Sequence, residues 1–279
     1  MDMPMQSTPL PPGPGSFPFV PPNRPGRPMT VWTWCPSEAA DEAPVLIVLH
    51  GASRNARTYR DAWVEAAEAA GALLVVPEFS KALFPTPREY EVGNMRDRQR
   101  LPLPPEEWVY ATIEALFDTA IRHARSRRRS YLLYGHSAGG QLVHRLLTFA
   151  PEARVEAAVS ANAGCYTMPV AGERFPYGLE GWPVSDDDLR RLFTRRHTIL
   201  LGEEDTDEED AILLKSPEAM RQGPHRFARG LSYFRTAERE AARLGAEFRW
   251  RLVTIPGVGH SNKRLAPHAA RLLVDDPAR

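Results

Sequence analysis

Apolar and polar positions along this chain follow two different periods. Continuous apolar runs at 45–49, 72–76 and 131–134 are typical of parallel strands buried on both faces. Further strand-like segments occupy 155–160, 197–201 and 248–255, and residues 30–34 alternate in the manner of an edge strand. Apolar residues spaced near 3.6 predict helices at 56–70, 105–121, 186–196 and 226–244, with a last helix from Lys263.

Local signals support several of these helix ends. Gly71 and Gly245 stand where a helix commonly ends in a left-handed residue, and Ser185 with Asp188 makes a capping-box-like start. Residues 78–104 show no clean period and are expected to form a long loop. The repeated strand–helix alternation predicts an α/β fold with a mostly parallel sheet and helices on both faces. Ligands in such sheets bind beyond the carboxyl ends of the strands.

The N-terminal segment differs from the rest in composition. Residues 1–28 hold ten of the 27 prolines, which leaves too few backbone donors for a helix or a central strand. We therefore expect a proline-rich arm at 1–28, followed by a single α/β domain at 29–279. Phe17 and Phe19 favour an arm that docks on the domain surface.

Composition excludes several classes of function. The formal net charge is zero, so nothing steers the whole molecule toward nucleic acid or an anionic membrane. No apolar stretch has the length of a membrane span, and the N-terminus lacks the features of a signal peptide, which favours a cytoplasmic location. Cys35 and Cys165 are too few for a disulfide scaffold, and whether they pair is open. The oligomeric state is also open, a homo-oligomer included.

The segment 131–140 carries the most specific chemical signal. An apolar run ends at Gly135-His136-Ser137-Ala138-Gly139, and a helical pattern follows at once. This is the Gly-x-Ser-x-Gly elbow in the strand–turn–helix context that it requires. A serine on so sharp a turn needs very small residues two positions before and after it. Ser137 is therefore the candidate nucleophile, although a glycine-rich turn with an incidental serine is the alternative.

A serine hydroxyl needs a base within hydrogen-bonding reach, and that base needs an acid to orient it. Position selects His260 among the eight histidines, because it follows the last predicted strand in a tight Gly-Val-Gly-His turn. We expect His50 to be a structural residue and the side chain of His136 to point away from the nucleophile.

The acid is expected on the loop after the strand at 197–201. That loop is rich in carboxylates, and Asp205 lies nearest the strand end, with Asp207 as the second choice. The order Ser137, Asp205, His260 is the nucleophile–acid–base order of one fold class. A solvated acidic turn without a catalytic member is the alternative interpretation.

Two backbone N–H groups must also face the charge that develops on a substrate carbonyl. The N–H of Ala138 directly follows the nucleophile at a helix start. The N–H of Ala52 follows the strand at 45–49, where Gly51 permits a tight turn. These two amides are the predicted oxyanion hole.

Together these motifs resemble the α/β-hydrolase superfamily over roughly residues 30 to 275. The short His50-Gly51-Ala52 turn is similar to the polyhydroxybutyrate-depolymerase-like and feruloyl-esterase-like branch, in which one small residue follows His-Gly. The resemblance implies an eight-stranded, mainly parallel sheet and hydrolysis of esters or related acyl compounds without a metal or an organic cofactor.

The leading hypothesis is therefore a serine hydrolase that cleaves a small-molecule carboxylic ester through an acyl-enzyme. A serine peptidase or amidase and a non-catalytic binding protein on the same scaffold are the alternatives. Two irregular stretches are expected to wall an aromatic pocket through Phe84, Tyr90, Tyr166, Phe175, Tyr177 and Trp182. The loop arginines Arg88, Arg96 and Arg98 either hold a carboxylate there or face water.

Overall fold

A computed structural model describes residues 10–37 and 41–274 of the chain, and it contains one mixed sheet. The strand order is β1-β2-β4-β3-β5-β6-β7-β8. β1 and β2 pair antiparallel, β2 joins β4 antiparallel, and all later neighbours are parallel. The strands are β1 (Gly13–Phe19), β2 (Met29–Cys35), β3 (Val45–Leu49), β4 (Leu73–Pro77), β5 (Tyr131–His136), β6 (Val155–Ala161), β7 (His197–Gly202) and β8 (Arg251–Ile255).

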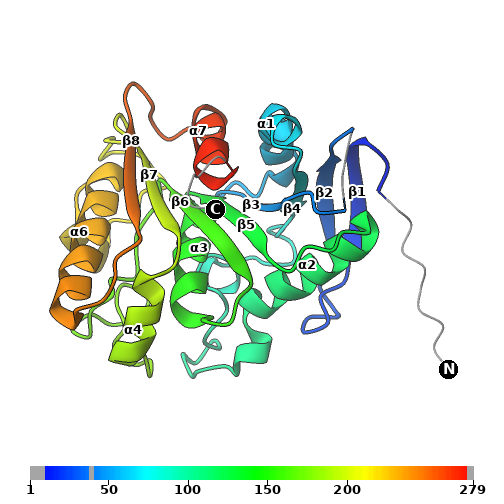
Figure 1. Cartoon of the computed structure of the whole chain (residues 1–279). Helices are drawn as coiled ribbons and strands as arrows, with labels where there is room; N and C mark the ends of the chain where they lie inside the picture. Colours follow the sequence, from blue (N-terminus) through cyan, green and yellow to red (C-terminus); the bar gives the residue numbers. More distant parts are fainter. Residues whose placement is uncertain (1–9, 38–40, 275–279) are drawn as a thin grey trace.

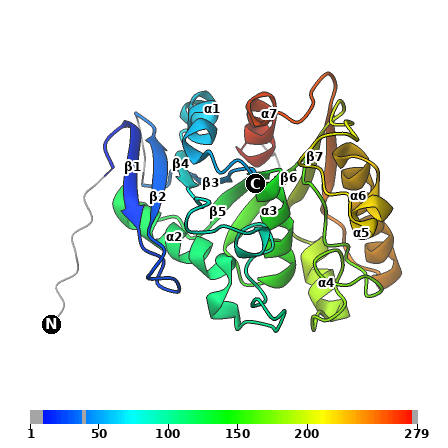
Figure 2. The same ribbon diagram turned by 180° about the vertical axis from the view of Figure 1, so that it is seen from behind.

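Helices cover both faces of the sheet (Figure 1). α1 and α7 lie together on one face, and α2, α3, α4 and α6 lie on the other, with α5 beside α6 in the view from behind (Figure 2). The helices are α1 (Ala56–Ala69), α2 (Val109–Ala124), α3 (Ala138–Phe149), α4 (Asp186–Phe193), α5 (Pro217–Gln222), α6 (Arg226–Leu244) and α7 (Asn262–Val274), with 3-10 turns at Pro87–Glu89 and Pro105–Glu107. This is the α/β-hydrolase fold that the sequence predicts.

The central strands divide the apolar interior into two cores. Along β3, Val45, Ile47 and Leu49 pack against the side of α2 and α3, while Leu46 and Val48 pack against α1 and α7. All five side chains are buried, because successive strand residues point to opposite faces and both faces are covered. Continuous apolar runs therefore mark the parallel strands that support the site.

The proline-rich segment departs from the expected arm. Residues 13–19 join the sheet as its edge strand β1, in antiparallel register with β2, so the expected boundary at residue 28 does not separate this segment from the sheet. Phe17 and Phe19 are buried, as docking requires, and Phe17 stacks on His123. An edge strand tolerates proline because one row of its backbone groups needs no partner. The segment at 30–34, expected as an edge, is consequently the second strand.

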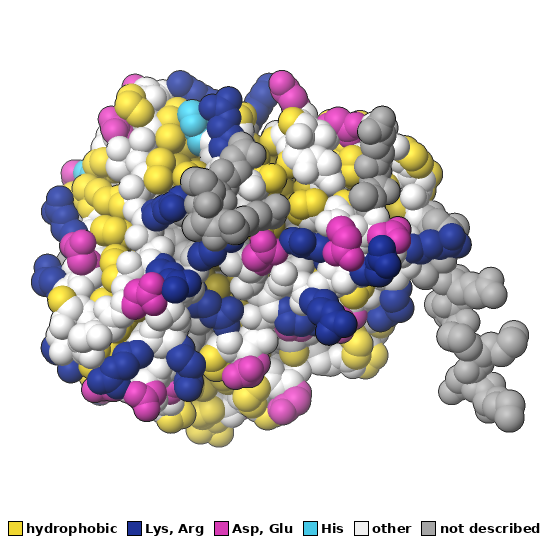
Figure 3. Space-filling view, in the orientation of Figure 1, with side chains coloured by type: hydrophobic (Ala, Val, Ile, Leu, Met, Phe, Trp, Pro, Cys, Tyr) yellow, Lys and Arg dark blue, Asp and Glu magenta, His cyan; other side chains and the backbone are white. Residues whose placement is uncertain are grey.

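The loop at 78–104 is long and irregular, as expected, and it is well packed. Phe79, Phe84 and Tyr90 are fully buried, and the hydroxyl of Tyr90 donates to the carbonyl oxygen of His50 at 2.7 Å. Cys35 and Cys165 are both buried and free, which answers the question of their pairing. On the face drawn in Figure 3, basic and acidic side chains are interspersed, in line with the formal net charge of zero.

Candidate active site

Ser137 occupies the turn between β5 and α3, and its backbone is in the left-handed region with φ +57°. A side chain rarely adopts this conformation, so the turn holds strain at the residue that carries the hydroxyl. A Cβ atom on Gly139 would lie 2.2 Å from the carbonyl oxygen of Leu49, and one on Gly135 would lie 2.2 Å from that of Gly139. The small residues that the elbow requires are therefore in place.

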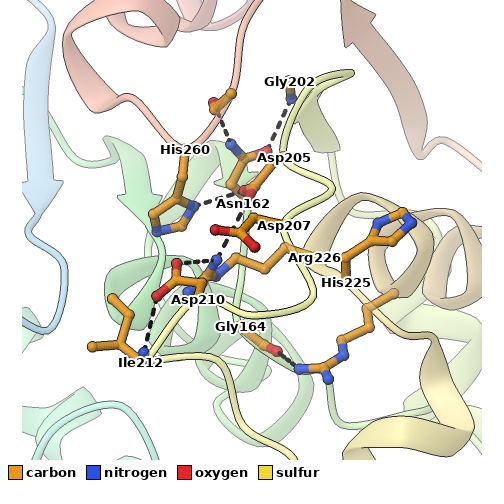
Figure 4. Close-up of polar contacts among 12 residues, drawn as sticks. Asn162, Gly164, Gly202, Asp205, Asp207, Asp210, Ile212, His225, Arg226 and His260 are labelled. Atoms are coloured by element: carbon orange, nitrogen blue, oxygen red, sulfur yellow. Dashed lines mark hydrogen bonds and ion pairs between the residues drawn. The ribbon is translucent and has the colours of Figure 1, made fainter.

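His260 lies on the loop between β8 and α7, and its Nδ1 atom is 2.7 Å from Oδ2 of Asp205 (Figure 4). Asp205 follows β7 and is buried, whereas Asp207 is exposed and accepts the backbone N–H of Glu209. The structure thus brings His260 to Asp205, the first of the two acids considered. With Nδ1 engaged, Nε2 is the nitrogen left to receive a proton from a hydroxyl.

Backbone contacts fix the position of Asp205. Its N–H donates to the carbonyl oxygen of Gly202 at 3.1 Å, and its carbonyl oxygen accepts the N–H of Phe227 at 3.1 Å. The loop thus turns back at the end of β7 and is attached to the first turn of α6. A short carboxylate held in this way can reach over the sheet edge to the imidazole.

Asn162 connects the loops of the acid and the base, and the sequence analysis missed it. Its Oδ1 atom accepts the N–H of Gly202 at 2.9 Å, and its Nδ2 atom donates to the carbonyl oxygen of Gly259 at 3.1 Å (Figure 4). Asn162 is buried and has φ +43°, a region that asparagine tolerates better than most residues. An asparagine just past a buried strand is a weak sequence signal, but a readable one.

Ser137 and His260 line one pocket of about 470 Å³. Its walls also include Gly51, Ala52, Ser53, Asn55, Thr58, Tyr59, Asp61, Ala62, His136, Ile212, Ser261, Asn262 and Lys263. Across residues 10–37 and 41–274, no hydrogen bond joins the hydroxyl of Ser137 to His260. Hydrogen bonds between a nucleophile and its base commonly tighten only in the complex with substrate.

His136 does not point away from the site, and here the sequence-based expectation is wrong. His136 is among the residues that line the same pocket, and its ring lies 4.5 Å from that of His260 between centroids. Nδ1 of His136 is 2.8 Å from the hydroxyl of Tyr59 on α1. Burial, and then the nearby His260 and Arg226, hold the pKa of His136 well below 6.5. The ring is therefore neutral.

His50 is structural, as expected. Its Nε2 accepts the N–H of Phe79 at 3.0 Å, and burial lowers the pKa of this histidine to about 3. The imidazole thereby ties the end of β3 to the loop that follows β4. The turn that begins at Gly51 is thereby fixed at its first residue.

The two predicted oxyanion donors lie on turns that meet at Ser137. Ala138 is the first residue of α3, so its N–H has no acceptor within the helix. Ala52 lines the pocket, and a Cβ atom on the preceding Gly51 would lie 3.4 Å from Cβ of Ser137. The turn after β3 therefore passes directly beside the candidate nucleophile.

The expected aromatic pocket is not found at this site. None of the six aromatic residues expected there is among the residues that line the pocket with Ser137. Tyr166 is fully buried and stacks on Tyr233, and Trp182 packs against Phe149 and Phe175. These rings pack their stretch against α3 and α6. The aromatic side chain that does line the pocket, besides the imidazoles, is Tyr59 from α1.

Two of the three loop arginines make contacts within the protein. Arg88 donates to Oδ1 of Asn94 and to the carbonyl oxygen of Arg96, and Arg96 lies over the ring of Trp182. Arg98 is exposed to water. None of the three lines the pocket of Ser137. Within the described residues, no group of three or more His, Cys, Asp or Glu side chains is arranged to hold a metal ion.

Two solved structures resemble this chain over nearly its whole length. Poly(aspartic acid) hydrolase-1 from Sphingomonas sp. KT-1 is 41% identical with a TM-score of 0.90, covering 95% of this chain and 99% of its own. The poly(3-hydroxybutyrate) depolymerase LpqC from Bordetella parapertussis is 36% identical with a TM-score of 0.88, covering 95% and 91%. An S-formylglutathione hydrolase from Agrobacterium tumefaciens, 16% identical with a TM-score of 0.60 over 93% and 95%, shares the fold.

The chain belongs to the α/β-hydrolase superfamily, in its polyhydroxybutyrate-depolymerase-like branch, and it is a hydrolase. No protein-family model and no curated protein matches the sequence. None of the helices within residues 10–37 and 41–274 is long and apolar enough to cross a membrane.

Proposed function

We propose that the protein hydrolyses carboxylic esters through an acyl-enzyme, with Ser137 as nucleophile, His260 as base and Asp205 as the orienting acid. The observation that carries this proposal is the 2.7 Å contact between Nδ1 of His260 and Asp205 at a pocket that Ser137 also lines. Ser137, Asp205 and His260 follow β5, β7 and β8, at the carboxyl ends of these strands. A nucleophile, a base and an acid in this relation define the serine-hydrolase mechanism.

The reaction proceeds in two halves. Oγ of Ser137 attacks the ester carbonyl carbon while Nε2 of His260 takes the hydroxyl proton, and Asp205 stabilises the imidazolium. The carbonyl oxygen becomes an oxyanion that accepts hydrogen bonds from the N–H groups of Ala52 and Ala138. When the carbonyl re-forms, the alcohol leaves with the proton from His260, and Ser137 stays acylated.

Water then replaces the alcohol. His260 removes a proton from the water as its oxygen attacks the acyl carbon, and the second oxyanion occupies the same two amides. Collapse breaks the bond to Oγ, and His260 returns its proton to Ser137 as the acid departs. The neutral His136 beside His260 adds no charge that would oppose the transient imidazolium.

Amide hydrolysis is the second candidate, and a specific observation favours it. The relative that is 41% identical is described as acting on poly(aspartic acid), a polymer joined by amide bonds. Lys263 is exposed at the pocket and would suit an anionic substrate. The same side chains would act, with His260 protonating a poorer leaving group.

Matched substrates separate the two functions. The purified protein is assayed for kcat/KM on an ester and an amide with the same acyl group. We expect turnover of the ester, and we expect Ser137→Ala to abolish it. Turnover of the amide, or of poly(aspartic acid), above that of the ester would replace the ester assignment with the amide one. Lack of turnover of either would reject both.

A further inference from the structure

The loop between Asp205 and α5 contributes one side chain to the candidate active site. Ile212 is 62% exposed, yet it lines the pocket together with Ser137 and His260. An apolar side chain at a concave site can pack against an apolar part of a ligand. Figure 4 shows Ile212 beside Asp210, whose carboxylate contacts Arg226.

Asp210 determines where Ile212 stands. Its Oδ1 atom accepts the N–H of Ile212 at 2.9 Å, and its carbonyl oxygen accepts the N–H of Leu213 at 2.9 Å. Leu213 is buried, so its side chain fastens the loop while Ile212 faces outward. Asp210 thus holds the turn at residues 210–213 through its side chain and its backbone carbonyl.

Arg226 joins this turn to the candidate acid. It is the first residue of α6 and only 2% exposed. Its Nη1 atom lies 2.8 Å from Oδ2 of Asp210 and 3.4 Å from Oδ1 of Asp205. The other carboxylate oxygen of Asp205 meets His260. One guanidinium nitrogen therefore lies between the turn that carries Ile212 and the acid that orients the base.

Arg226 forms ion pairs with both carboxylates. The shorter contact goes to Asp210, so this aspartate shares the buried arginine charge with Asp205. Burial raises the pKa of Asp210, but the N–H of Ile212 and the charge of Arg226 more than offset this effect and lower it overall. Asp210 is thus ionised and compensates part of the charge of Arg226.

We propose that Ile212 is a specificity-determining residue that packs against an apolar group of the substrate. Asp210 and Arg226 are positioning residues that hold this wall and the acid Asp205 in a common arrangement. This inference rests on the proposed ester hydrolysis and names the part of the pocket that selects the substrate. Acyl or alcohol groups that reach Ile212 gain apolar contact in the transition state, while acetyl and methyl groups are too short to use it.

Chain-length profiles test the proposal. Ile212→Ala should lower kcat/KM for the longest of a series of p-nitrophenyl acyl esters, or of a series of acetate alkyl esters, about tenfold relative to the shortest member. Leu214→Ala is the matched control, because Leu214 is on the same loop and 40% exposed but does not line the pocket. Its profile should match that of the wild type.

Asp210→Asn tests the positioning role, because the amide keeps an acceptor for Ile212 but loses the charge that engages Arg226. Without the ion pair to Arg226 the turn that carries Ile212 is held less firmly, so the preference in kcat/KM for long over short esters should decrease. The variant should also lower kcat for the shortest ester, since Arg226 then turns its charge toward Asp205. Asp210→Glu, which restores the charge, should recover kcat in part. A merely structural role would lower stability without changing the ratio of long to short substrates.

The outcomes separate this inference from the function on which it rests. Ester turnover that survives Ser137→Ala, or is absent from the wild type, rejects the proposed function. The inference alone is rejected if ester turnover depends on Ser137 but neither Ile212→Ala nor Asp210→Asn changes the ratio of kcat/KM between long and short esters, in both ester series.

Discussion

The imidazole rings of His136 and His260 lie 4.5 Å apart between centroids, with their planes tilted by 39°. The residue that precedes the candidate nucleophile is therefore packed against the candidate base. Because burial keeps His136 neutral, it supports the position of His260 without repelling a proton on it. The hydroxyl of Tyr59, 2.8 Å from Nδ1 of His136, holds this arrangement from α1.

Stability should fall as the pH decreases below 6.5. His50, His136, His144 and His197 are buried, and burial lowers the pKa of each, to about 3 for His50 and His197. In the unfolded chain each titrates near 6.5, so below that pH the unfolded state binds protons that the folded state does not. Each such histidine costs about 1.4 kcal/mol between pH 7.5 and 5.5.

Urea unfolding at pH 7.5 and 5.5 measures this loss. The free energy of unfolding should be lower at the acid pH, and His197→Gln should show a smaller difference between the two by about 1.4 kcal/mol. Equal urea midpoints for the wild type at both pH values would contradict the assignment of neutral buried histidines.

Asp205 and Asp207 should differ sharply when each is replaced by asparagine. Asp205→Asn removes the carboxylate charge that stabilises the imidazolium of His260, and its amide N–H can favour the wrong tautomer of the ring, so kcat should fall by roughly 10⁴. Asp207→Asn changes an exposed side chain of the same loop, and kcat should stay within about twofold of the wild type. Ester kinetics at pH 8 provide the comparison, and equal losses in the two variants would remove Asp205 from its role.

Gly139→Ala should destabilise the fold by about 3 kcal/mol, or about 6–12 °C in Tm for a chain of this size. The added Cβ would lie 2.2 Å from the carbonyl oxygen of Leu49 and 2.9 Å from that of His50, and backbone cannot give way cheaply. Gly172→Ala is the control, since a Cβ there meets nothing within 4 Å. Calorimetry that finds the two variants alike would refute the tight elbow.

The edge strand β1 should contribute strongly to stability. Phe17→Ala removes a buried ring that stacks on His123, at a cost of about 3–5 kcal/mol. Ser16→Ala, its exposed neighbour, should change the free energy of unfolding by less than about 0.5 kcal/mol. Denaturant unfolding of both variants decides whether this segment is part of the folded domain, and a neutral Phe17→Ala would show that it is not.

The residues that form the parallel strands and the elbow were readable because their signals are local. The run at 45–49 is apolar throughout since both faces of β3 are covered, and Gly135 and Gly139 flank Ser137 because neither position has room for a Cβ. Asp205, which contacts His260, could be chosen as the candidate acid by its distance from the strand end. In contrast, β1 was not predicted because it contains prolines. Proline lacks the N–H that a central strand must donate, so it argues against a strand except at the edge of a sheet.

What was missed depends on contacts between distant segments. Trp182 and Tyr166 were expected at the pocket because the sequence shows that loops carry aromatic rings, but not whether those rings face a ligand or one another. Ile212 is connected to Arg226 through the side chain of Asp210, and such a contact between a loop and a helix produces no periodic pattern in the sequence. The helix α5 did have a local signal, Ser216 before Pro217, which is a cap and a favoured first residue.

The most direct test of the account is the reactivity of Ser137. Wild-type protein should become labelled by a fluorophosphonate probe at Ser137 and should hydrolyse a short p-nitrophenyl ester. The Ser137→Ala variant, once circular dichroism shows that it is folded, should not be labelled, and its kcat should be lower by about 10⁴-fold or more. A variant that retains near wild-type turnover, or a probe adduct found on another residue of the active wild type, would contradict the claim that this hydroxyl performs the chemistry.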